Sequence, residues 1–321
     1  MIYLYIFLCS FMFSLFFISL FIKLKGSAKK ISCVGGAGIY AAFLIVMLAA
    51  LFLKEIEASK VLGLIISSGI ILVLGLIDDA SELRPSLKIL GELLGIGVLA
   101  AFGIITKIVF LPLWANVLIT ILWVLFITNA FNLLDIMDGL ASGLIIIISL
   151  TFLIIAVIDR DFFSALILIA LIGAHLGFLK YNYPPAQVYM GDSGSLFSGF
   201  LLAALAINIR YAPMDRPMAL FTPLLVLSLP IYDTLFLIIM RLKKKKPIFN
   251  KSEDHIALRL VNAGCSVRKS VLIMYCFSLF LAVSSLVVAF SSNITAAIML
   301  TVIILVFILM GKRVGIVRVK E

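Results

Sequence analysis

The feature that most constrains this chain is a series of long apolar segments separated by short polar breaks. About eleven of them, each about 17–23 residues long, recur from one end of the sequence to the other. They lie at residues 2–22, 36–53, 61–77, 87–105, 112–129, 139–157, 162–180, 193–210, 217–241, 269–290 and 294–311. A helix of that length crosses the roughly 30 Å of hydrocarbon in a bilayer. The sequence therefore predicts an all-α integral membrane protein, a polytopic bundle of about 10–11 transmembrane helices forming a single domain over residues 1–321.

Composition and charge placement agree with this class and set an orientation. The chain is 64% hydrophobic and 13% charged, with a mean hydropathy of +1.27. Its net charge of +10 would suit a nucleic acid, but the placement of the basic residues gives another reason for it. With the N-terminus outside, 20 of the 26 Lys and Arg residues fall in inner loops. We therefore expect a multi-pass protein of the cell (inner or plasma) membrane, with its N-terminus outside and no nucleic-acid partner.

Four polar stretches interrupt the apolar background. They cover residues 75–88, 128–143, 180–195 and 241–260. The orientation derived from the basic residues places all four on the cytoplasmic face. Polar residues with only structural roles would fall on both faces about equally. One shared site in cytoplasmic loops is therefore predicted.

The first two stretches carry carboxylates and amides at helix ends. Asp78 and Asp79 are adjacent, and such a pair either forms a solvated helix end or has a function, in which it holds Mg²⁺ or accepts a proton. Asn129, Asn132, Asp135 and Asp138 follow at intervals of three, with Gly139 after them. One buried Asn is explained by hydrogen bonding between helices. The whole series fits better with a helix end at which a hydrated metal and a polar ligand meet the protein.

The last two stretches favour anionic groups. Asp192 lies in a glycine-flanked turn with Ser193 and Ser195, where backbone N–H groups at a helix start favour a phosphate. His255 and Arg259 are four residues apart and would share one helix face. That face either is solvated or binds a diphosphate, because Arg forms bidentate bonds to phosphate. The four stretches together therefore fit phosphoryl transfer, in which positioning and charge neutralisation do most of the catalysis.

In this order and spacing, "GLIDDASELRPSLK", "NAFNLLDIMDGLASG", "GFLKYNYPPAQVYMGDSGS" and the loop containing His255 resemble a known superfamily. It comprises the polyprenyl-phosphate N-acetylhexosamine-1-phosphate transferases, glycosyltransferase family 4. The bacterial undecaprenyl-phosphate GlcNAc-1-phosphate transferases and the phospho-MurNAc-pentapeptide transferases belong to it. The resemblance covers residues from about Lys30 to Gly264. It implies transfer of a sugar-1-phosphate from a UDP-N-acetylhexosamine to a polyprenyl phosphate, with release of UMP and with Mg²⁺, or alternatively Mn²⁺, as cofactor.

The resemblance also implies residue roles. Asp78, supported by Asp79, would bind or deprotonate the lipid phosphate, and Asp192 would share in catalysis. Asn132 and Asp192 would hold the metal. The expected substrate-binding residues are Lys30, Asn129, Asp135, Asp138, Gly139, Asn182, His255 and Arg259.

Several departures from the family pattern leave the donor sugar open. Ile136 stands where a glycine is usual, Ser32 where a proline is usual, and Glu92 where a glutamine is common. Ala257 and Leu258 replace two histidines of the GlcNAc-transferase arm. GlcNAc is the expected sugar, and GalNAc or a deoxy-amino sugar is the alternative. The histidine-rich signature of the MurNAc-pentapeptide enzyme is missing, which argues against that substrate.

Two readings outside active transferases stay open from the sequence. A secondary transporter or flippase would use intramembrane carboxylates, but such sites lie near the bilayer midplane between repeated halves. In this chain the acids gather at one face and no repeat is evident. A catalytically inactive homologue would lack part of the Asp and Asn set, which is present here. The lipid length, the glycan pathway (lipopolysaccharide or teichoic acid among others) and pairing as a homodimer are not determined by the sequence.

Overall fold

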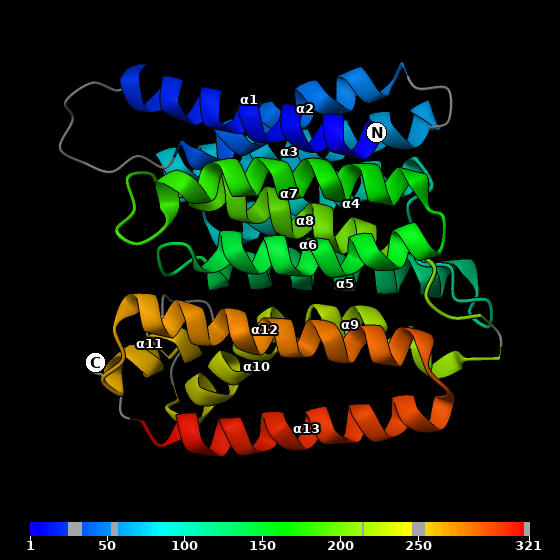
Figure 1. Cartoon of the computed structure of the whole chain (residues 1–321), viewed down its shortest axis with the longest axis vertical. Helices are drawn as coiled ribbons and strands as arrows, with labels where there is room; N and C mark the ends of the chain where they lie inside the picture. The colour runs from blue at the N-terminus through cyan, green and yellow to red at the C-terminus, as the bar shows by residue number, and fades with distance from the viewer. Residues whose placement is uncertain (25–33, 53–56, 214, 246–253, 318–321) are drawn as a thin grey trace. The chain divides into compact units, whose positions relative to one another are not determined.

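A computed structural model of the chain describes residues 1–24, 34–52, 57–213, 215–245 and 254–317. The chain forms two compact units, Met1–Arg210 and Tyr211–Glu321, here called the N-terminal and C-terminal units. The sequence predicts a single domain over residues 1–321, with no boundary near Arg210. Figure 1 shows both, coloured from blue at the N-terminus to red at the C-terminus.

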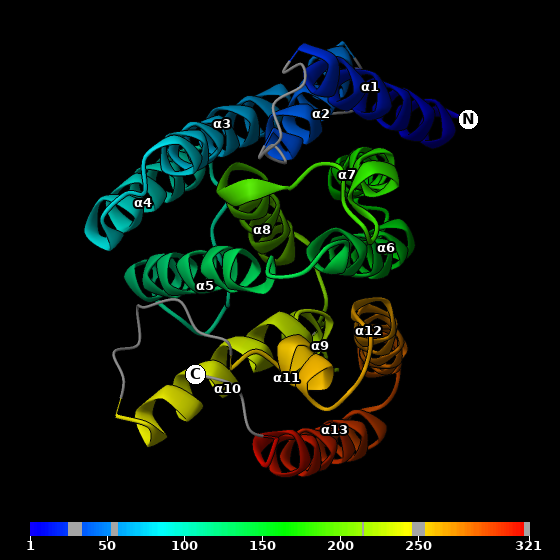
Figure 2. The same cartoon turned by 90° about the vertical axis from the view of Figure 1, so that its left-hand side faces the viewer.

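The N-terminal unit is a bundle of eight described helices with α8 at its centre. In chain order they are α1 (Ile2–Leu24), α2 (Gly35–Ala50), α3 (Ala58–Ala80), α4 (Pro85–Ala101), α5 (Leu113–Leu134), α6 (Leu140–Ile158), α7 (Phe162–Asn182) and α8 (Gly191–Asn208). Helix α8 packs against α2, α3 and α5, with further contacts to α6 and α7 (Figure 2). Every residue of α8 from Ser193 to Ala206 is buried. The start of α8 is therefore surrounded by the ends of other helices.

Small residues allow this close packing. A Cβ on Gly36 would collide with the backbone of Gly194, and a Cβ on Gly75 would collide with the backbone of Ser193. Helices in a membrane associate through such small residues because lipid offers no hydrophobic gain for bringing larger apolar side chains together. The glycines therefore bring α2 and α3 against the first turn of α8.

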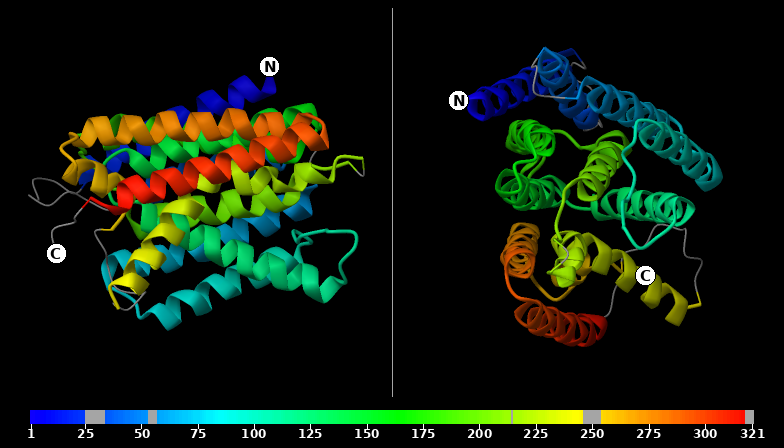
Figure 3. Two further views of the ribbon diagram at one scale, coloured as in Figure 1. Left: turned by 90° about the horizontal axis from the view of Figure 1, so that it is seen from below. Right: turned by 90° about the vertical axis from the view of Figure 1, so that its right-hand side faces the viewer.

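The C-terminal unit contains the short helix η1 (Pro217–Phe221) and the helices α9 (Thr222–Val226), α10 (Ser228–Lys243), α11 (Ile256–Asn262), α12 (Val267–Phe290) and α13 (Asn293–Gly315). The sequence predicted one continuous span at 217–241. The structure instead bends by 69° between Pro217–Val226 and Ser228–Lys243. Pro230 accounts for the break, because it has no N–H to donate to the carbonyl of Val226 and its ring crowds that carbonyl. Helices α12 and α13 pack side by side (Figure 3).

The all-α membrane class is confirmed, and the described residues contain no strand. All eleven predicted apolar segments fall on helices. Seven described helices are long and apolar enough to cross a membrane, and the bent pair would make an eighth. The helices α2, α4 and α8 have 16, 17 and 18 residues, close to the lower limit of about 17 for a span, and they are not among the seven. Large apolar side chains remain exposed along the bundle, for instance Ile298 and Leu305 on α13, as expected for lipid-facing surface.

Candidate active site

Three of the four polar stretches meet at one end of the N-terminal unit. The end of α3, the start of α4, the end of α5, the end of α7 and the start of α8 are joined there by side-chain hydrogen bonds and ion pairs. The fourth stretch belongs to the C-terminal unit. Lys30 lies outside the described residues. The prediction that separate motifs converge on one site is therefore confirmed for the first three.

Lys88 bridges two of the predicted catalytic carboxylates. Its Nζ forms an ion pair with Oδ2 of Asp78 and a second one, at 3.1 Å, with Oδ2 of Asp192. The other oxygen of Asp78 accepts the backbone N–H of Leu83 at 2.7 Å. Asp78 is buried, whereas the side chain of Asp192 keeps 36% of its surface exposed. Asp192 is therefore the more accessible of the two carboxylates.

Lys88 was not among the site residues predicted from the sequence. The available signal was a lysine in the first turn of an apolar helix that begins directly after the Asp pair. Helix α4 starts at Pro85, so Lys88 lies one turn before the buried Glu92 on the same face. A cation placed on the buried face of a membrane helix needs an anionic partner, and the Asp pair supplies it.

Asp79 caps the start of α8. Its Oδ1 accepts the backbone N–H of Asp192 at 2.8 Å, and its Oδ2 accepts the N–H of Ser193 at 3.1 Å. Helix α8 has no cap from its own N-cap residue, Met190. A carboxylate at a helix start is favoured by the unpaired N–H groups and by the helix dipole. Both oxygens of Asp79 are thus used in positioning α8, a role that the sequence analysis did not foresee.

The same contacts occupy backbone N–H groups of the glycine-flanked turn at residues 191–195. Two of the N–H groups that the sequence offered to a phosphate are already paired with Asp79. Ser193 is fully buried, so its hydroxyl does not face the open side of the site. Ser195 is buried as well, and its hydroxyl donates to the carbonyl of Gly191 at 3.0 Å. The turn serves mainly to present the side chain of Asp192.

Asn132 and Asp192 are adjacent, as the predicted metal role requires. The Nδ2 of Asn132 donates to Oδ1 of Asp192 at 3.0 Å and to the hydroxyl of Ser195 at 3.1 Å. The amide and carboxylate oxygens are the hard ligands that Mg²⁺ prefers, and the ammonium of Lys88 already places one cation beside Asp192. The described residues contain no group of three or more His, Cys, Asp or Glu arranged for a metal. This donor set fits Mg²⁺, which commonly takes one or two protein ligands and completes its shell with water and substrate phosphates.

The loop after α5 presents an unpaired carboxyl group. Burial, followed by the negative charges of Asp192, Asp79 and Asp138, raises the pKa of Asp135 to about 7. In the described part of the chain, no hydrogen-bond donor contacts this carboxyl group. Ile136, where the family commonly has glycine, does not adopt a positive φ, so this backbone does not require glycine. A cation or a donor group of a ligand at this position would relieve the repulsion on Asp135.

Asn182 and Asp138 hold two loops together. The Oδ1 of Asn182 accepts the backbone N–H of Gly139 at 2.9 Å, and its Nδ2 donates to the carbonyl of Val188 at 2.9 Å. The Oδ2 of Asp138 accepts the N–H of Ala186 at 2.9 Å. Gly139 has a φ of 76°, a conformation that favours glycine. Of these predicted substrate-binding residues, Asn182 and Gly139 are therefore placed as supports of the loops.

Asn129 also has a structural partner. Its Nδ2 donates to Oε2 of Glu92 at 2.6 Å and to the carbonyl of Leu125 at 2.9 Å. Glu92 is buried, and a donor of this kind offsets part of the cost of burying its carboxyl group. The pair joins α4 to α5, one helical turn along α4 from Lys88. Glu92, which the sequence marked only as a departure from a common Gln, is therefore a partner of Asn129.

In the C-terminal unit, Arg259 is buried and fully engaged. Its Nε donates to the carbonyl of Asp254 at 3.2 Å, and its Nη2 donates to the carboxylate of Asp254 at 2.6 Å. Its Nη1 donates to the last carbonyls of α13 and the residue beyond it, at 3.1 Å for Val314, 3.4 Å for Gly315 and 2.6 Å for Val317. A guanidinium is well suited to such a helix end. A diphosphate would have to compete with all these partners for Arg259.

Asp254 completes this cluster. Burial would raise the pKa of Asp254, but hydrogen bonds from Lys244 and Arg259 outweigh it and hold the pKa below its usual range. The Nζ of Lys244 lies 2.9 and 3.1 Å from the two carboxylate oxygens. His255, also buried, contacts Asp233 instead. The short α11 is thus tied both to α10 and to the end of α13.

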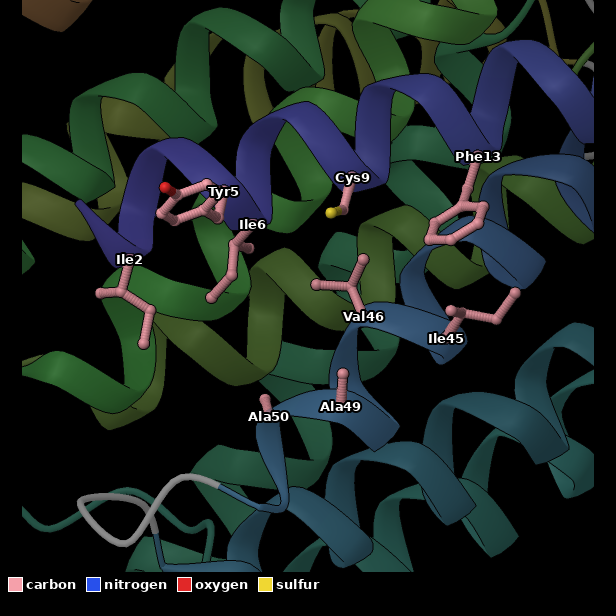
Figure 4. A pocket seen from close by; sticks show the side chains of 9 residues that line it. All are labelled: Ile2, Tyr5, Ile6, Cys9, Phe13, Ile45, Val46, Ala49 and Ala50. Atoms are coloured by element: carbon pink, nitrogen blue, oxygen red, sulfur yellow. The ribbon is translucent and has the colours of Figure 1, made fainter.

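A shallow apolar cavity lies apart from the polar site, between α1 and α2. It has a volume of about 230 Å³, and its lining includes Tyr5, Cys9, Phe13 and Val46 (Figure 4). None of its lining residues belongs to the four polar stretches.

Comparison with known proteins gives the family. Residues 61–210 match the model of "Glycosyl transferase family 4". A probable undecaprenyl-phosphate N-acetylglucosaminyl 1-phosphate transferase of Bacillus subtilis is 32% identical over 282 residues, which cover 85% of this chain and 77% of that protein. The chain belongs to glycosyl transferase family 4. The family predicted from the four motifs is therefore confirmed, and with it the prediction of a membrane-bound transferase.

Other known proteins resemble the chain to different extents. A decaprenyl-phosphate N-acetylglucosaminephosphotransferase of Mycobacterium tuberculosis is 31% identical over 314 residues, covering 88% of this chain and 76% of that protein. A phospho-N-acetylmuramoyl-pentapeptide-transferase of Streptococcus mutans is 46% identical, but only over 94 residues, or 29% of this chain. The similarity thus extends over most of the chain for the N-acetylglucosamine relatives and over a smaller part for the pentapeptide relative.

Proposed function

We propose that the chain transfers GlcNAc-1-phosphate from UDP-GlcNAc to a polyprenyl phosphate and releases UMP. The relatives that match most of its length are named for transfer of N-acetylglucosamine phosphate to undecaprenyl or decaprenyl phosphate. The observation that carries the proposal is the cluster of Lys88 with Asp78 and Asp192, beside Asn132. It combines a lysine ammonium, two carboxylates and an amide, and such groups can bind phosphates directly or through a metal ion.

The reaction exchanges one phosphoanhydride for another. An oxygen of the lipid phosphate attacks the β-phosphorus of the sugar nucleotide, and the bond from that phosphorus to the α-phosphate oxygen breaks. UMP leaves, and the sugar stays on the lipid diphosphate. Mg²⁺ held by Asn132 and Asp192 would neutralise charge on the diphosphate of the donor. Since the lipid phosphate is already largely ionised near neutral pH, the protein has mainly to position it.

The residues of the cluster can do this positioning. Lys88 can exchange a carboxylate partner for an oxygen of the lipid phosphate, because a lysine ammonium is a compact charge on a flexible stem. The backbone N–H of Leu83 holds Asp78 in place next to Lys88. Asp78 can therefore keep the ammonium in position while its other partner is exchanged. Asp135 faces the carboxylates of Asp192 and Asp79 without a donor of its own, and we assign it to the nucleotide. Lys30 and His255 are also assigned to substrate binding, on the family resemblance.

The location and the donor sugar of the protein are part of the proposed function. We assign the protein to the cell membrane, with the N-terminus outside and the site on the cytoplasmic face, on the distribution of basic residues. A sibling activity with another UDP-amino sugar is the second candidate, because Ala257 and Leu258 replace two histidines of the arm. Ala257 is buried in α11 and presents no polar group to a sugar. A transporter is disfavoured because the carboxylates of the cluster, Asp78, Asp79 and Asp192, lie at helix ends.

The test is a reconstitution. Purified protein is supplied with undecaprenyl phosphate, a panel of UDP-sugars and either Mg²⁺, Mn²⁺ or EDTA, and UMP release is followed. The proposal requires release of UMP with UDP-GlcNAc, dependence on the divalent ion, and a lipid product that carries one sugar and two phosphates. Release with a different sugar alone would establish the sibling activity. No release with any sugar, from protein whose fold is intact, would overturn the proposal.

A further inference from the structure

Asp233 and His255 form a buried pair in the C-terminal unit. Asp233 lies on α10 and is 1% exposed, and His255 immediately precedes α11 and is 2% exposed. The Nδ1 of His255 lies 2.7 Å from Oδ2 of Asp233. At this distance and burial, the hydrogen bond is a fixed part of the fold. Neither the motifs nor the family resemblance had pointed to Asp233.

The second oxygen of Asp233 is used as well. Its Oδ1 accepts the backbone N–H of Ile256 at 2.8 Å. That N–H belongs to the first turn of α11, for which His255 itself provides no side-chain cap. One carboxylate therefore holds both the start of α11 and the imidazole ring beside it. Ring and helix cannot move independently while both bonds are made.

These bonds determine which ring nitrogen carries the proton. An ionised carboxylate only accepts hydrogen bonds, so Nδ1 of His255 must donate. In the part of the chain that the structure describes, Nε2 has no hydrogen-bond partner. The ring is thus held through Nδ1, and Nε2 is the nitrogen left for a ligand.

We propose that Asp233 is a positioning residue that holds His255 as its Nδ1–H form, so that Nε2 is the nitrogen that binds an anionic oxygen of the donor substrate. With the carboxylate on Nδ1–H, the ring can take a second proton at Nε2 and become a cation. That cation donates to a phosphate oxygen while its charge is balanced by Asp233. Naming the ligand as a phosphate oxygen of the donor rests on the proposed function. The assignment of the tautomer does not.

Other charged groups near the pair are already matched with one another. Asp254, the residue before His255, is paired with Lys244 from the end of α10 and with Arg259 on α11. The side chain of Arg259 also donates to the carbonyls of Val314 and Gly315 at the end of α13. The carboxylate of Asp233 is therefore the group that binds the ring directly. The charges of Asp254, Lys244 and Arg259 are unchanged in the variants compared below.

An asparagine at position 233 would reverse the tautomer. The N–H of Ile256 is a fixed donor, so the amide oxygen of Asn must face it. The amide NH₂ then faces Nδ1, which has to accept, and the ring proton moves to Nε2. Such a ring cannot easily become a cation, because its second proton would have to enter at Nδ1 against the NH₂ group. Asp233→Asn thus keeps the helix contact and changes the ring.

Nitrogen NMR tests this directly, because the chain has only two histidines. Protein with ¹⁵N-labelled imidazoles is measured between about pH 5 and 8. The second histidine, His175, is identified as the signal that remains in His255→Gln. In the unmodified protein, Nδ1 of His255 should show the shift of a protonated nitrogen at every pH measured. In Asp233→Asn the two assignments should exchange, and in the charge-matched control Asp215→Asn they should not.

A contrary tautomer is easy to recognise. If Nδ1 of the unmodified protein shows the shift of an unprotonated nitrogen, the proton resides on Asp233 or Nε2 and the proposal is wrong. This measurement needs no variant, so it stands even if Asp233→Asn does not fold. It also needs no substrate, so failure of the proposed reaction and failure of this inference give different results.

Activity then tests the link to the substrate. We expect Asp233→Asn and His255→Gln each to lower UMP release by about 10²-fold, the lower range for loss of a positioned acid–base group. The double variant should lose no more than His255→Gln alone, because Asp233 acts through the ring. The losses should lie mainly in the KM for the UDP-sugar, and the KM for the lipid phosphate should change little. Additive losses, or unchanged donor KM in both single variants, would overturn the assignment of Nε2 to the donor.

Discussion

Asp79 and Asp192 are joined through the backbone: Oδ1 of Asp79 accepts the N–H of Asp192 at 2.8 Å, across 113 positions of sequence. The adjacent N–H of Ser193 is bound by the other oxygen of Asp79. The two residues of the Asp pair therefore have different partners. Asp78 faces Lys88, and Asp79 fixes the start of the helix that carries Asp192.

We expect Asp79→Asn to weaken the cap and with it the placement of Asp192. Asn has one accepting oxygen for two N–H groups, so one of them loses its partner. The cost to stability should be about 1–2 kcal/mol. If Asp192 holds Mg²⁺, the concentration of Mg²⁺ for half-maximal UMP release should rise. Ser86→Ala, at an exposed position in α4, is the control, and an unchanged Mg²⁺ requirement in Asp79→Asn would contradict the positioning role.

Lys88→Met should nearly abolish activity. The substitution keeps an unbranched side chain of similar length but leaves Asp78 and Asp192 facing each other without a cation. Breaking a buried ion pair on one side commonly costs about 3–5 kcal/mol, and less where one partner is as exposed as Asp192. The melting temperature should therefore fall as well, and added Mg²⁺ should restore part of it. Lys107→Met, at an exposed position in a distant loop, provides the comparison.

Asp135 should make stability depend on pH near neutrality. Its folded pKa is about 7, whereas an unfolded Asp titrates near 4. Between these values the folded protein binds more protons, so its stability falls as pH rises. In Mg²⁺-free buffer, Asp135→Asn should raise the melting temperature over the unmodified protein at pH 8, with little difference at pH 4. An equal effect at both pH values would show that this carboxyl group is not strained by its neighbours.

Arg259→Gln should destabilise the C-terminal unit. The variant loses the ion pair with Asp254 and the bonds to the carbonyls of Val314 and Val317. A loss of about 3–5 kcal/mol is expected for a buried pair broken on one side. Thermal unfolding measures it, with the exposed Lys269→Gln as control. If Arg259→Gln kept its stability and lost only activity, the guanidinium would be a substrate ligand after all.

Asp254 gives the opposite dependence on pH from Asp135. Its folded pKa is lowered, so its contribution to stability is fully present above the unfolded pKa, near 4, and is lost as pH falls through the folded pKa. Asp254→Asn should therefore be much less stable than the unmodified protein at pH 7, and the difference should shrink below about pH 4. Melting temperatures of both proteins across that range provide the measurement.

Much of this fold follows from hydrophobic length alone. Every apolar segment predicted from the sequence became helix, because a chain in lipid must satisfy its backbone groups within the segment. The span at 217–241 also became helix, but it is bent between Val226 and Ser228 although its apolar length is sufficient. The motifs gave the family, and three of them meet in one place as expected.

The sequence determined the membrane class, the order of the helices and the residue types of the site. Only the tertiary structure decided what each polar residue does. Asn182, predicted to bind substrate, and Asp79, predicted to support Asp78 in catalysis, hold loops and a helix start in place, while Lys88 and Asp233 have partners that no motif indicated. The physical reason is that spacing along one helix specifies which residues share a face, but not which donors meet that face from another helix. A carboxylate whose two oxygens are already bonded has a different chemistry from one that is free, and that difference exists only after the helices have packed.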